Sequence, residues 1–234
     1  MAAVGEAGGQ VVGWLLVRSD TSEPLTYRPY VCNDDAMPRR TAADAAVTRR
    51  TILDAGRATF AEGGYQAATL DGIALRAGVT RGAVHHHFGD KRELFVEVFE
   101  QVEREVNDAV VAAALAATPT GLEPFEAGCR KLFELFARPD LRRIVLADAP
   151  AVLGLVDWYE IDRGFGLATV RAGLQSLAAE GALDRAHTEA LALLLYGALT
   201  EASLALGAGL TTVDQAAIIE TVERILRAFV PASP

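Results

Sequence analysis

Three consecutive histidines, His85 to His87, are the side chains whose type and spacing first suggest chemistry. Three imidazoles could bind zinc, but consecutive residues of a helix point about 100° apart and cannot face one ion. Metal ligands on one helix recur at i and i+4, and the only other histidine is the distant His187. We therefore expect no metal site and no cofactor.

Sequence motifs of catalytic sites are also missing. The chain has no G-x-S-x-G elbow, no P-loop and no complete G-x-G-x-x-G. Acidic pairs such as Asp157 and Glu160 are common on helix surfaces and do not by themselves indicate catalysis. The only cysteines, Cys32 and Cys129, give no disulfide framework, which suits a reducing cytoplasm. We expect a cytoplasmic protein that is not an enzyme.

The histidines instead lie within a pattern that predicts a helix-turn-helix. Thr69 can cap a short helix at 70–77, Gly78 can supply a left-handed turn, and Thr80 can cap a second helix at 81–88. The second helix of this motif enters the DNA major groove, and the start of the first can bind a phosphate. The residues predicted to contact DNA are Thr69, Thr80, Arg81, Gly82, His85, His86 and Lys91.

Several of these side chains have a specific chemical reason to contact DNA. The guanidinium of Arg81 matches the O6/N7 edge of guanine. His85 and His86 can hydrogen-bond to bases or phosphates, and their protonation would add positive charge there. Lys91 opens a helix, where a cation suits the helix dipole poorly, so we expect it to contact a phosphate instead. His87 is expected to be a packed or solvent-exposed residue that does not touch DNA.

The net charge of −9 argues against a nucleic-acid partner only if charge is spread evenly. Between Arg39 and Arg92 the chain has nine basic and five acidic residues, a net +4 that leaves −13 for the remainder. Phosphate binding could therefore be confined to this segment. Arg39 and Arg40 could form a basic arm beside a DNA groove.

Hydrophobic periodicity and scarce aromatic residues predict an all-α fold. Ile52, Gly56 and Phe60 form one stripe of a helix at about 43–62. Asp90 can cap a helix that runs to about residue 115. No apolar run approaches the roughly 18 residues of a membrane span. Further helices are expected at about 123–137, 140–148, 152–180, 185–207 and 212–230.

The segment TLDGIALRAGVTRGAVHHHFGDKRELF, Thr69 to Phe95, resembles the DNA-binding domain of the TetR family of bacterial transcriptional regulators. The preceding ILDAGRATFAEGGYQAAT resembles the first helix of that family and its turn at Gly64-Tyr65. The likeness covers about residues 47–100 and departs at His85, where the family often has a tyrosine that reaches a phosphate; here that contact could depend on pH. The resemblance implies an all-helical homodimer, a C-terminal ligand-binding domain, and release from DNA when a small molecule binds.

The resemblance also implies two sites in the C-terminal half, although both residue sets could equally be ordinary core. The last two helices resemble those that form a four-helix dimer interface, with candidates Leu195, Leu199, Ala202, Ile218, Val222 and Ile225. The central helices resemble those that line the ligand cavity, with candidates Cys129, Phe133, Phe136, Trp158, Tyr159 and Asp162.

We therefore predict a ligand-responsive repressor that binds a palindromic double-stranded DNA operator as a homodimer, is released by an unidentified small-molecule effector, and has no membrane partner. Its expected parts are a flexible N-terminal extension at 1–42, a helix-turn-helix DNA-binding domain at 43–100, and a helical ligand-binding and dimerisation domain at 101–234. Met37 is a candidate natural start, so residues 1–36 could be dispensable. The alternatives are an enzyme and an architectural DNA binder without an effector. The sequence identifies neither effector nor operator, and does not separate repression from activation.

Overall fold

The computed structural model describes residues 4–7, 10–17, 26–31, 42–118 and 121–230. These divide into two compact units, residues 1–46 and residues 47–234. The basic arm predicted at Arg39 and Arg40 lies outside the described residues.

The first unit contains a three-stranded antiparallel sheet. Its strands are β1 (Val4–Ala7), β2 (Gln10–Val17) and β3 (Thr26–Val31), with β2 in the centre. Pro29 is compatible with β3 because an edge strand can dispense with one backbone donor. The prediction of a flexible extension over 1–42 missed these strands, because β2 is a nearly continuous apolar run rather than an alternating one.

The helical part of the chain begins with α1 (Ala42–Ala67), α2 (Leu70–Ala77) and α3 (Arg81–Phe88). Helical assignment in α1 continues past its predicted end, but the helix kinks at Gly64, whose φ of 77° lies in the left-handed region. The glycine expected to stop the first helix therefore bends it.

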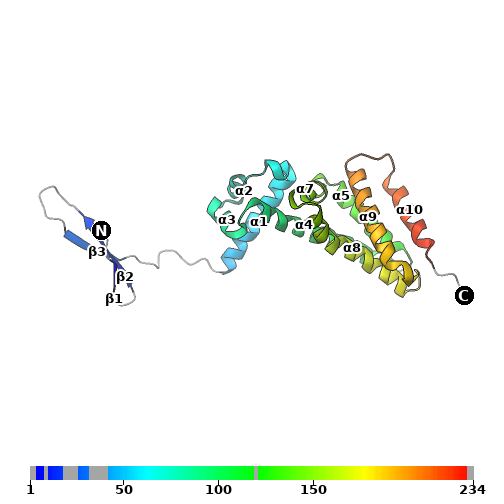
Figure 1. The fold of residues 1–234 in the computed structure, drawn as a ribbon, viewed down its shortest axis with the longest axis horizontal. Coiled ribbons are helices and arrows are strands. Elements are labelled where there is room, and N and C mark those ends of the chain that lie inside the picture. The colour runs from blue at the N-terminus through cyan, green and yellow to red at the C-terminus, as the bar shows by residue number, and fades with distance from the viewer. Residues whose placement is uncertain (1–3, 8–9, 18–25, 32–41, 119–120, 231–234) are drawn as a thin grey trace. The chain divides into compact units, whose positions relative to one another are not determined.

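Further helices complete the second unit (Figure 1). The π-helical segment η2 occupies the second half of the helix predicted at 140–148, and Gly154, with φ 85°, breaks the one predicted at 152–180. The all-α prediction is confirmed for the described residues from 42 onward. The elements are α4 (Lys91–Ala116), α5 (Glu123–Ala137), α6 (Pro139–Arg142), η2 (Arg143–Asp148), α7 (Ala149–Leu153), α8 (Leu155–Ala179), η3 (Arg185–His187), α9 (Thr188–Gly207) and α10 (Gln215–Arg227).

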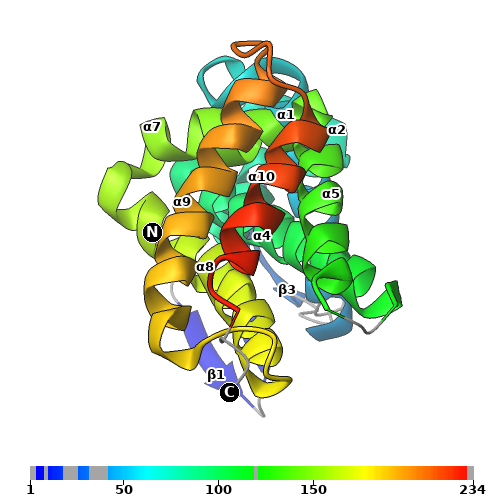
Figure 2. The same cartoon turned by 90° about the vertical axis from the view of Figure 1, so that its right-hand side faces the viewer.

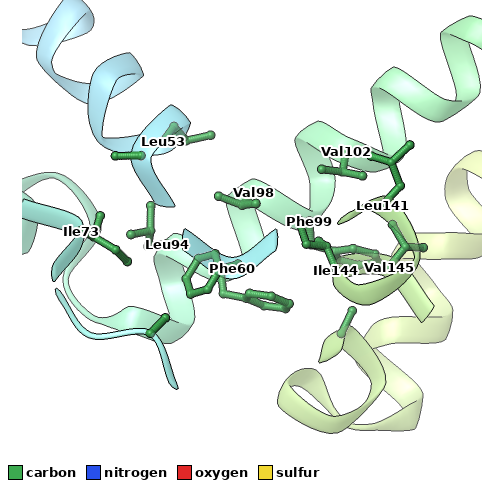
Figure 3. Close-up of a cluster of buried hydrophobic side chains, with 14 of the residues drawn as sticks. Leu53, Phe60, Ile73, Leu94, Val98, Phe99, Val102, Leu141, Ile144 and Val145 are labelled. Carbon is green, nitrogen blue, oxygen red and sulfur yellow. The ribbon is translucent and has the colours of Figure 1, made fainter. Parts of the chain in front are cut away.

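One hydrophobic cluster contains buried side chains from α1, α2, α3 and α4 and from η2 and the helices on either side of it. Phe60 and Leu94 pack near its α1 end, and Phe99 packs beside Ile144 and Val145 farther along α4 (Figure 3). All five side chains are fully buried. The helix α4 contributes to both ends of this cluster. Because the cluster is closely packed, a displacement of η2 would shift α4 and the helices that precede it.

A second hydrophobic cluster joins α5, α8, α9 and α10. Leu174, Ala192 and Leu226 are almost completely buried in it. The helices α9 and α10 lie side by side (Figure 2).

The stretch Arg185–Gly207, which includes α9, is long and apolar enough by composition to cross a membrane, the one such helix in the part of the chain that the structure describes. The sequence analysis expected no run of this kind. A core helix of a soluble protein meets the same criterion, and one side of α9 packs in the second cluster. Only 33% of the most apolar 18 residues of this stretch are buried within the chain, so much apolar surface remains exposed.

Candidate nucleic-acid interface and ligand cavity

The helices α2 and α3 and the turn between them form a helix-turn-helix. The Thr69 hydroxyl accepts a hydrogen bond from the Gly72 amide at 3.1 Å, and the Thr80 hydroxyl accepts one from the Ala83 amide at 3.2 Å. Gly78 ends α2 with φ 67°, a left-handed conformation that glycine adopts readily. The predicted caps and turn are confirmed.

The candidate recognition surface is the exposed face of α3. Val84 and Phe88 are buried in the first cluster, which fixes the rotation of the helix about its axis. The opposite face therefore points outward. The exposed residues on it are Arg81, Gly82, His85 and His86. The structure brings these four predicted residues together, and their contact with DNA stays a prediction.

The three histidines diverge around α3 rather than converge. His85 and His86 are exposed and His87 is half-buried, and the His86 and His87 rings meet at a tilted 67° with their centroids 5.4 Å apart. Among the described residues, no group of three or more His, Cys, Asp or Glu side chains is arranged to hold a metal ion.

Arg81 has a partner on the same motif. Its Nη1 donates to Asp71 Oδ2 at 2.9 Å, and the two side chains are 68% and 66% exposed. An exposed pair of this kind contributes at most about 1 kcal/mol. The guanidinium has five N–H donors, so this pair leaves several for a base edge.

His85 is oriented by a carbonyl at the end of its helix. Its Nδ1 contacts the Gly89 carbonyl oxygen. A carbonyl only accepts hydrogen bonds, so Nδ1 carries a proton and Nε2 is left for another partner. Nε2 is an acceptor when the ring is neutral and a donor when the ring is protonated, and a phosphate oxygen requires a donor.

Lys91 has an internal role that the sequence analysis did not anticipate. Its Nζ donates to the carbonyl oxygens of Tyr65 and Ala68, each at 2.9 Å, and lies 4.2 Å from the centroid of the Tyr65 ring. The ammonium thus ties the end of α1 to the start of α4, which explains a lysine at a helix start without DNA. Its predicted phosphate contact is untested and would have to use the remaining donor.

The positive charge counted in the sequence around α3 is partly neutralised in the fold. Arg49 pairs with Glu97, and Arg57 pairs with Glu105 at 2.5 Å. The hydrogen bond from Arg57 lowers the pKa of the Glu105 carboxyl. Both acids lie on α4, beyond the segment 39–92, so its net charge overstates the charge available to phosphates.

A cavity of about 590 Å³ lies among α4, α5, α8 and α9. Small residues on α8 leave room for aromatic rings that line it. A Cβ at Gly166 would lie 3.1 Å from the Tyr196 ring, and one at Gly173 would lie 3.2 Å from the Phe125 ring. The volume is typical of sites that bury a small organic molecule.

Three residues predicted to bind a ligand line this cavity: Cys129, Phe136 and Asp162. Burial raises the pKa of the Cys129 thiol to about 12. The thiol is therefore neutral near pH 7 and acts as apolar lining.

The other three predicted ligand residues lie outside the cavity lining. Trp158 packs against the first cluster and its Nε1 donates to the Val145 carbonyl oxygen at 3.1 Å. Phe133 is buried in the second cluster, where Tyr159 packs at its edge with its ring 6.1 Å from that of Tyr196. Their aromatic character fits core packing as well as ligand binding, so the sequence alone did not separate the two roles.

Two carboxyls and a phenol form the polar group of the cavity. Glu103 and Asp162 are only 4% and 7% exposed. The Tyr196 hydroxyl donates to Asp162 Oδ2, whereas Glu103 Oε1 is buried and has no hydrogen-bond partner among the residues that the structure describes. Burial raises the pKa of both carboxyls, and the charge of Asp162 raises that of Glu103 further. Glu103 and Tyr196 were not predicted, although an acid within the apolar stripe of α4 was a visible signal.

The predicted dimer residues divide between the core and the surface. Leu195, Leu199 and Val222 are 2%, 4% and 6% exposed, because they pack inside the second cluster. Burial within one chain leaves these three little surface for a second chain, and their contact with a partner stays a prediction. Ala202 and Ile218 are half-buried.

The exposed apolar residues of α9 and α10 include Ile225, which was predicted, and Leu193 and Leu194, which were not. Leu193 and Leu194 are 52% and 68% exposed, and Ile225 on α10 is 40% exposed. Gly197 and Ala198 continue this face along α9 and are exposed too. An all-round apolar helix gives no periodicity to separate its inner side from its outer side.

Two family profiles match the chain. Residues 52–98 match one described as bacterial regulatory proteins, tetR family, and residues 122–229 match one described as tetracyclin repressor-like, C-terminal domain. Together they cover the helix-turn-helix and most of the cavity-forming helices.

A solved structure and curated proteins are similar as well. A TetR-family transcriptional regulator from Pectobacterium atrosepticum is 32% identical, with a TM-score of 0.68 over 83% of this chain and 100% of that chain. The HTH-type transcriptional repressor BepR of Brucella suis is 37% identical over 107 residues, 46% of this chain and 51% of BepR. AcrR of Shigella flexneri, an HTH-type transcriptional regulator, is 42% identical over 72 residues, 31% of this chain and 34% of AcrR. The matches span about half and a third of these curated relatives.

Proposed function

Because the chain belongs to the TetR family of bacterial regulatory proteins, which are transcription factors and not enzymes, we propose that it is a ligand-responsive cytoplasmic repressor. It binds a palindromic operator as a homodimer and leaves it when a small-molecule effector binds. The observation that carries this proposal is the exposed face of α3, held in place by the buried Val84 and Phe88.

DNA recognition follows from what α3 exposes. With α3 in the major groove, Arg81 reads a guanine edge and the flat surface at Gly82 lets the backbone approach the bases. The amides at the start of α2, beside Thr69, bind a backbone phosphate. Phosphate contacts set the register, and Arg81 supplies sequence information.

Dimerisation provides the second reading head. One short helix contacts few base pairs, and a two-fold dimer can place two such helices about 34–36 Å apart on one side of the duplex. The exposed residues Leu193, Leu194 and Ile225 form an apolar face that a second copy of the chain would cover. Gly197 and Ala198 lack bulk, so a partner helix can approach α9 closely.

The effector binds in the cavity and acts on the helix-turn-helix through η2. Leu146 of η2 lines the cavity. Arg143 of the same segment donates to the Ala61 carbonyl oxygen of α1 at 2.9 Å. A ligand that displaces η2 therefore alters the placement of α1, and with it the spacing of the two reading heads.

Selection of binding sites from random duplex DNA by the purified chain, at fixed salt, tests the proposal. Enrichment of a palindrome whose half-sites lie about one helical turn apart, or a small multiple of it, would support it. A folded, dimeric chain that enriches no sequence would refute it. The selected duplex then serves for testing small molecules for release.

A further inference from the structure

The lining of the cavity carries acidic groups without a base to balance them. Glu103, Asp162 and Glu180 are its acidic residues. None of the described residues that line the cavity is a lysine, an arginine or a histidine. An anionic ligand would therefore meet only like charge and no cationic partner.

Glu103 is the member of this group that calls for an external partner. It is 4% exposed, and its Oε1 has no hydrogen-bond partner among the described residues. Buried polar atoms are nearly always hydrogen-bonded, so an unpaired carboxyl oxygen beside an empty volume suits a ligand that donates to it. Asp162 differs, because the Tyr196 hydroxyl already donates to it.

The remainder of the cavity lining is mostly apolar and aromatic, and its neutral polar side chains besides Tyr196 are Asn107, Thr169, Ser176, Thr200 and Ser203. Phe125, Phe136 and Phe165 line it together with many aliphatic residues. Such walls accept the hydrocarbon part of a ligand, and aromatic faces attract a cation. Among the described residues that line the cavity, only the carboxyls are ionisable to a charge near pH 7.

We propose that this cavity binds an apolar molecule that carries one positively charged amine, whose N–H groups donate to the carboxyls of Glu103 and Asp162. The inference rests on the proposed function, since it assigns a chemical class to the effector. The titratable groups facing the amine are Glu103, Asp162 and the Tyr196 hydroxyl. Without the amine, a proton shared by the two carboxyls limits their repulsion; the arriving ammonium displaces that proton into solvent.

Calorimetric titration of the full chain with three matched biphenyl compounds tests this class. They are 4-phenylbenzylamine, 4-phenylbenzyl alcohol and 4-phenylbenzoate, which share an apolar body and differ in charge. The amine should bind at least about tenfold more tightly than either of the others. Equal affinities, a preference for the benzoate, or no binding of the amine would overturn the proposal.

Two variants locate the anchor. Glu103→Gln keeps the shape of the side chain and removes its charge. This variant should bind the amine about tenfold more weakly and bind the alcohol with nearly unchanged affinity. Glu180→Gln, a lining acid that is exposed, is the matched control and should change the amine less than about twofold. Loss of amine affinity in Glu180→Gln but not in Glu103→Gln would contradict the assignment.

Proton release gives a readout in the unmodified chain. Titrations at pH 7 in two buffers with different ionisation enthalpies should show proton release with the amine and none with the alcohol. Absence of release with the amine would overturn the shared-proton arrangement.

Operator binding by the same chain is followed separately. Amine binding that leaves DNA affinity unchanged would refute the effector role and support the site, whereas release by the alcohol or benzoate would refute the amine class and support the regulator.

Discussion

The backbone amide of Tyr65 donates a hydrogen bond to Asp148 Oδ2 at 2.8 Å, across 83 residues of sequence. Arg143, five residues before Asp148, holds the Ala61 carbonyl oxygen at 2.9 Å. Leu146 lies between them in sequence and lines the cavity. The segment η2 therefore touches the end of α1 on one side and the candidate effector site on the other. π-Helical segments are often found at functional sites.

Replacing Asp148 by alanine should loosen this connection. A lost hydrogen bond to a charged acceptor costs about 1–3 kcal/mol of unfolding free energy, measurable by urea denaturation. Hydrogen exchange at the Tyr65 amide should accelerate. The control is Asp157→Ala, which removes an exposed ion pair with Arg92 of 3.4 Å and should cost less than about 0.5 kcal/mol. Equal losses of unfolding free energy in both variants would show that the hydrogen bond from Tyr65 to Asp148 stabilises the chain no more than an exposed ion pair does.

Replacing Arg81 by alanine should cost about 1–3 kcal/mol at one base pair of the operator and relax specificity there. Asp71→Asn removes the acid that Arg81 contacts at 2.9 Å and should leave operator affinity unchanged or raise it by up to about 1 kcal/mol. Titration of the selected operator and its single-base variants at fixed salt measures both effects. An equal loss on every duplex in the arginine variant would assign Arg81 to a phosphate instead.

The helix-turn-helix was predictable because its determinants are local. Thr69 and Thr80 cap helices that begin one residue later, and Gly78 adopts the left-handed turn that separates them. The interactions involved span three or four residues, so the sequence order contains them. The outward face of α3 then follows from helical periodicity around Val84 and Phe88.

The cavity and the candidate dimer face were not predictable in the same way, because their determinants are distant in sequence. Glu103 and Asp162 come together only when α4 packs against α8. Lys91 donates to the Tyr65 carbonyl only when the end of α1 packs against the start of α4. On α9, apolar residues surround the helix, so Leu195 and its outward neighbours look alike until the neighbouring helices are placed. Periodicity identifies an apolar face but not which of two faces is inside.

Replacing Leu194 by glutamate should produce a monomer. The side chain is 68% exposed in one chain, so the fold should tolerate a charge, whereas a covered dimer face would not. Sedimentation at micromolar concentration reports the assembly, and operator affinity should fall at least about tenfold because one head is lost. Leu155→Glu alters a leucine that is 70% exposed at the start of α8 and should remain dimeric. A dimeric Leu194→Glu variant would remove α9 from the interface.

The unmodified chain should lose stability as pH rises, and Glu103→Gln should reduce that loss. Burial, and then the charge of Asp162, hold the pKa of Glu103 well above 4.5 in the folded chain. The folded state therefore binds this proton more tightly than the unfolded state does. Its stabilising effect is complete below about pH 4.5 and disappears as pH rises through the raised pKa. The pKa of Asp162 is raised too and acts in the same direction.

Glutamine cannot ionise, so Glu103→Gln should be more stable than the unmodified chain by about 1–3 kcal/mol at pH 8, and by less at pH 5. Urea denaturation at pH 5, 6, 7 and 8 measures the difference. Glu180→Gln changes an exposed acid of the same cavity, and its free energy of unfolding should depend on pH as that of the unmodified chain does. If Glu103→Gln also ran parallel, the buried carboxyl would carry no proton linkage, and the acid pair would be ionised without a ligand.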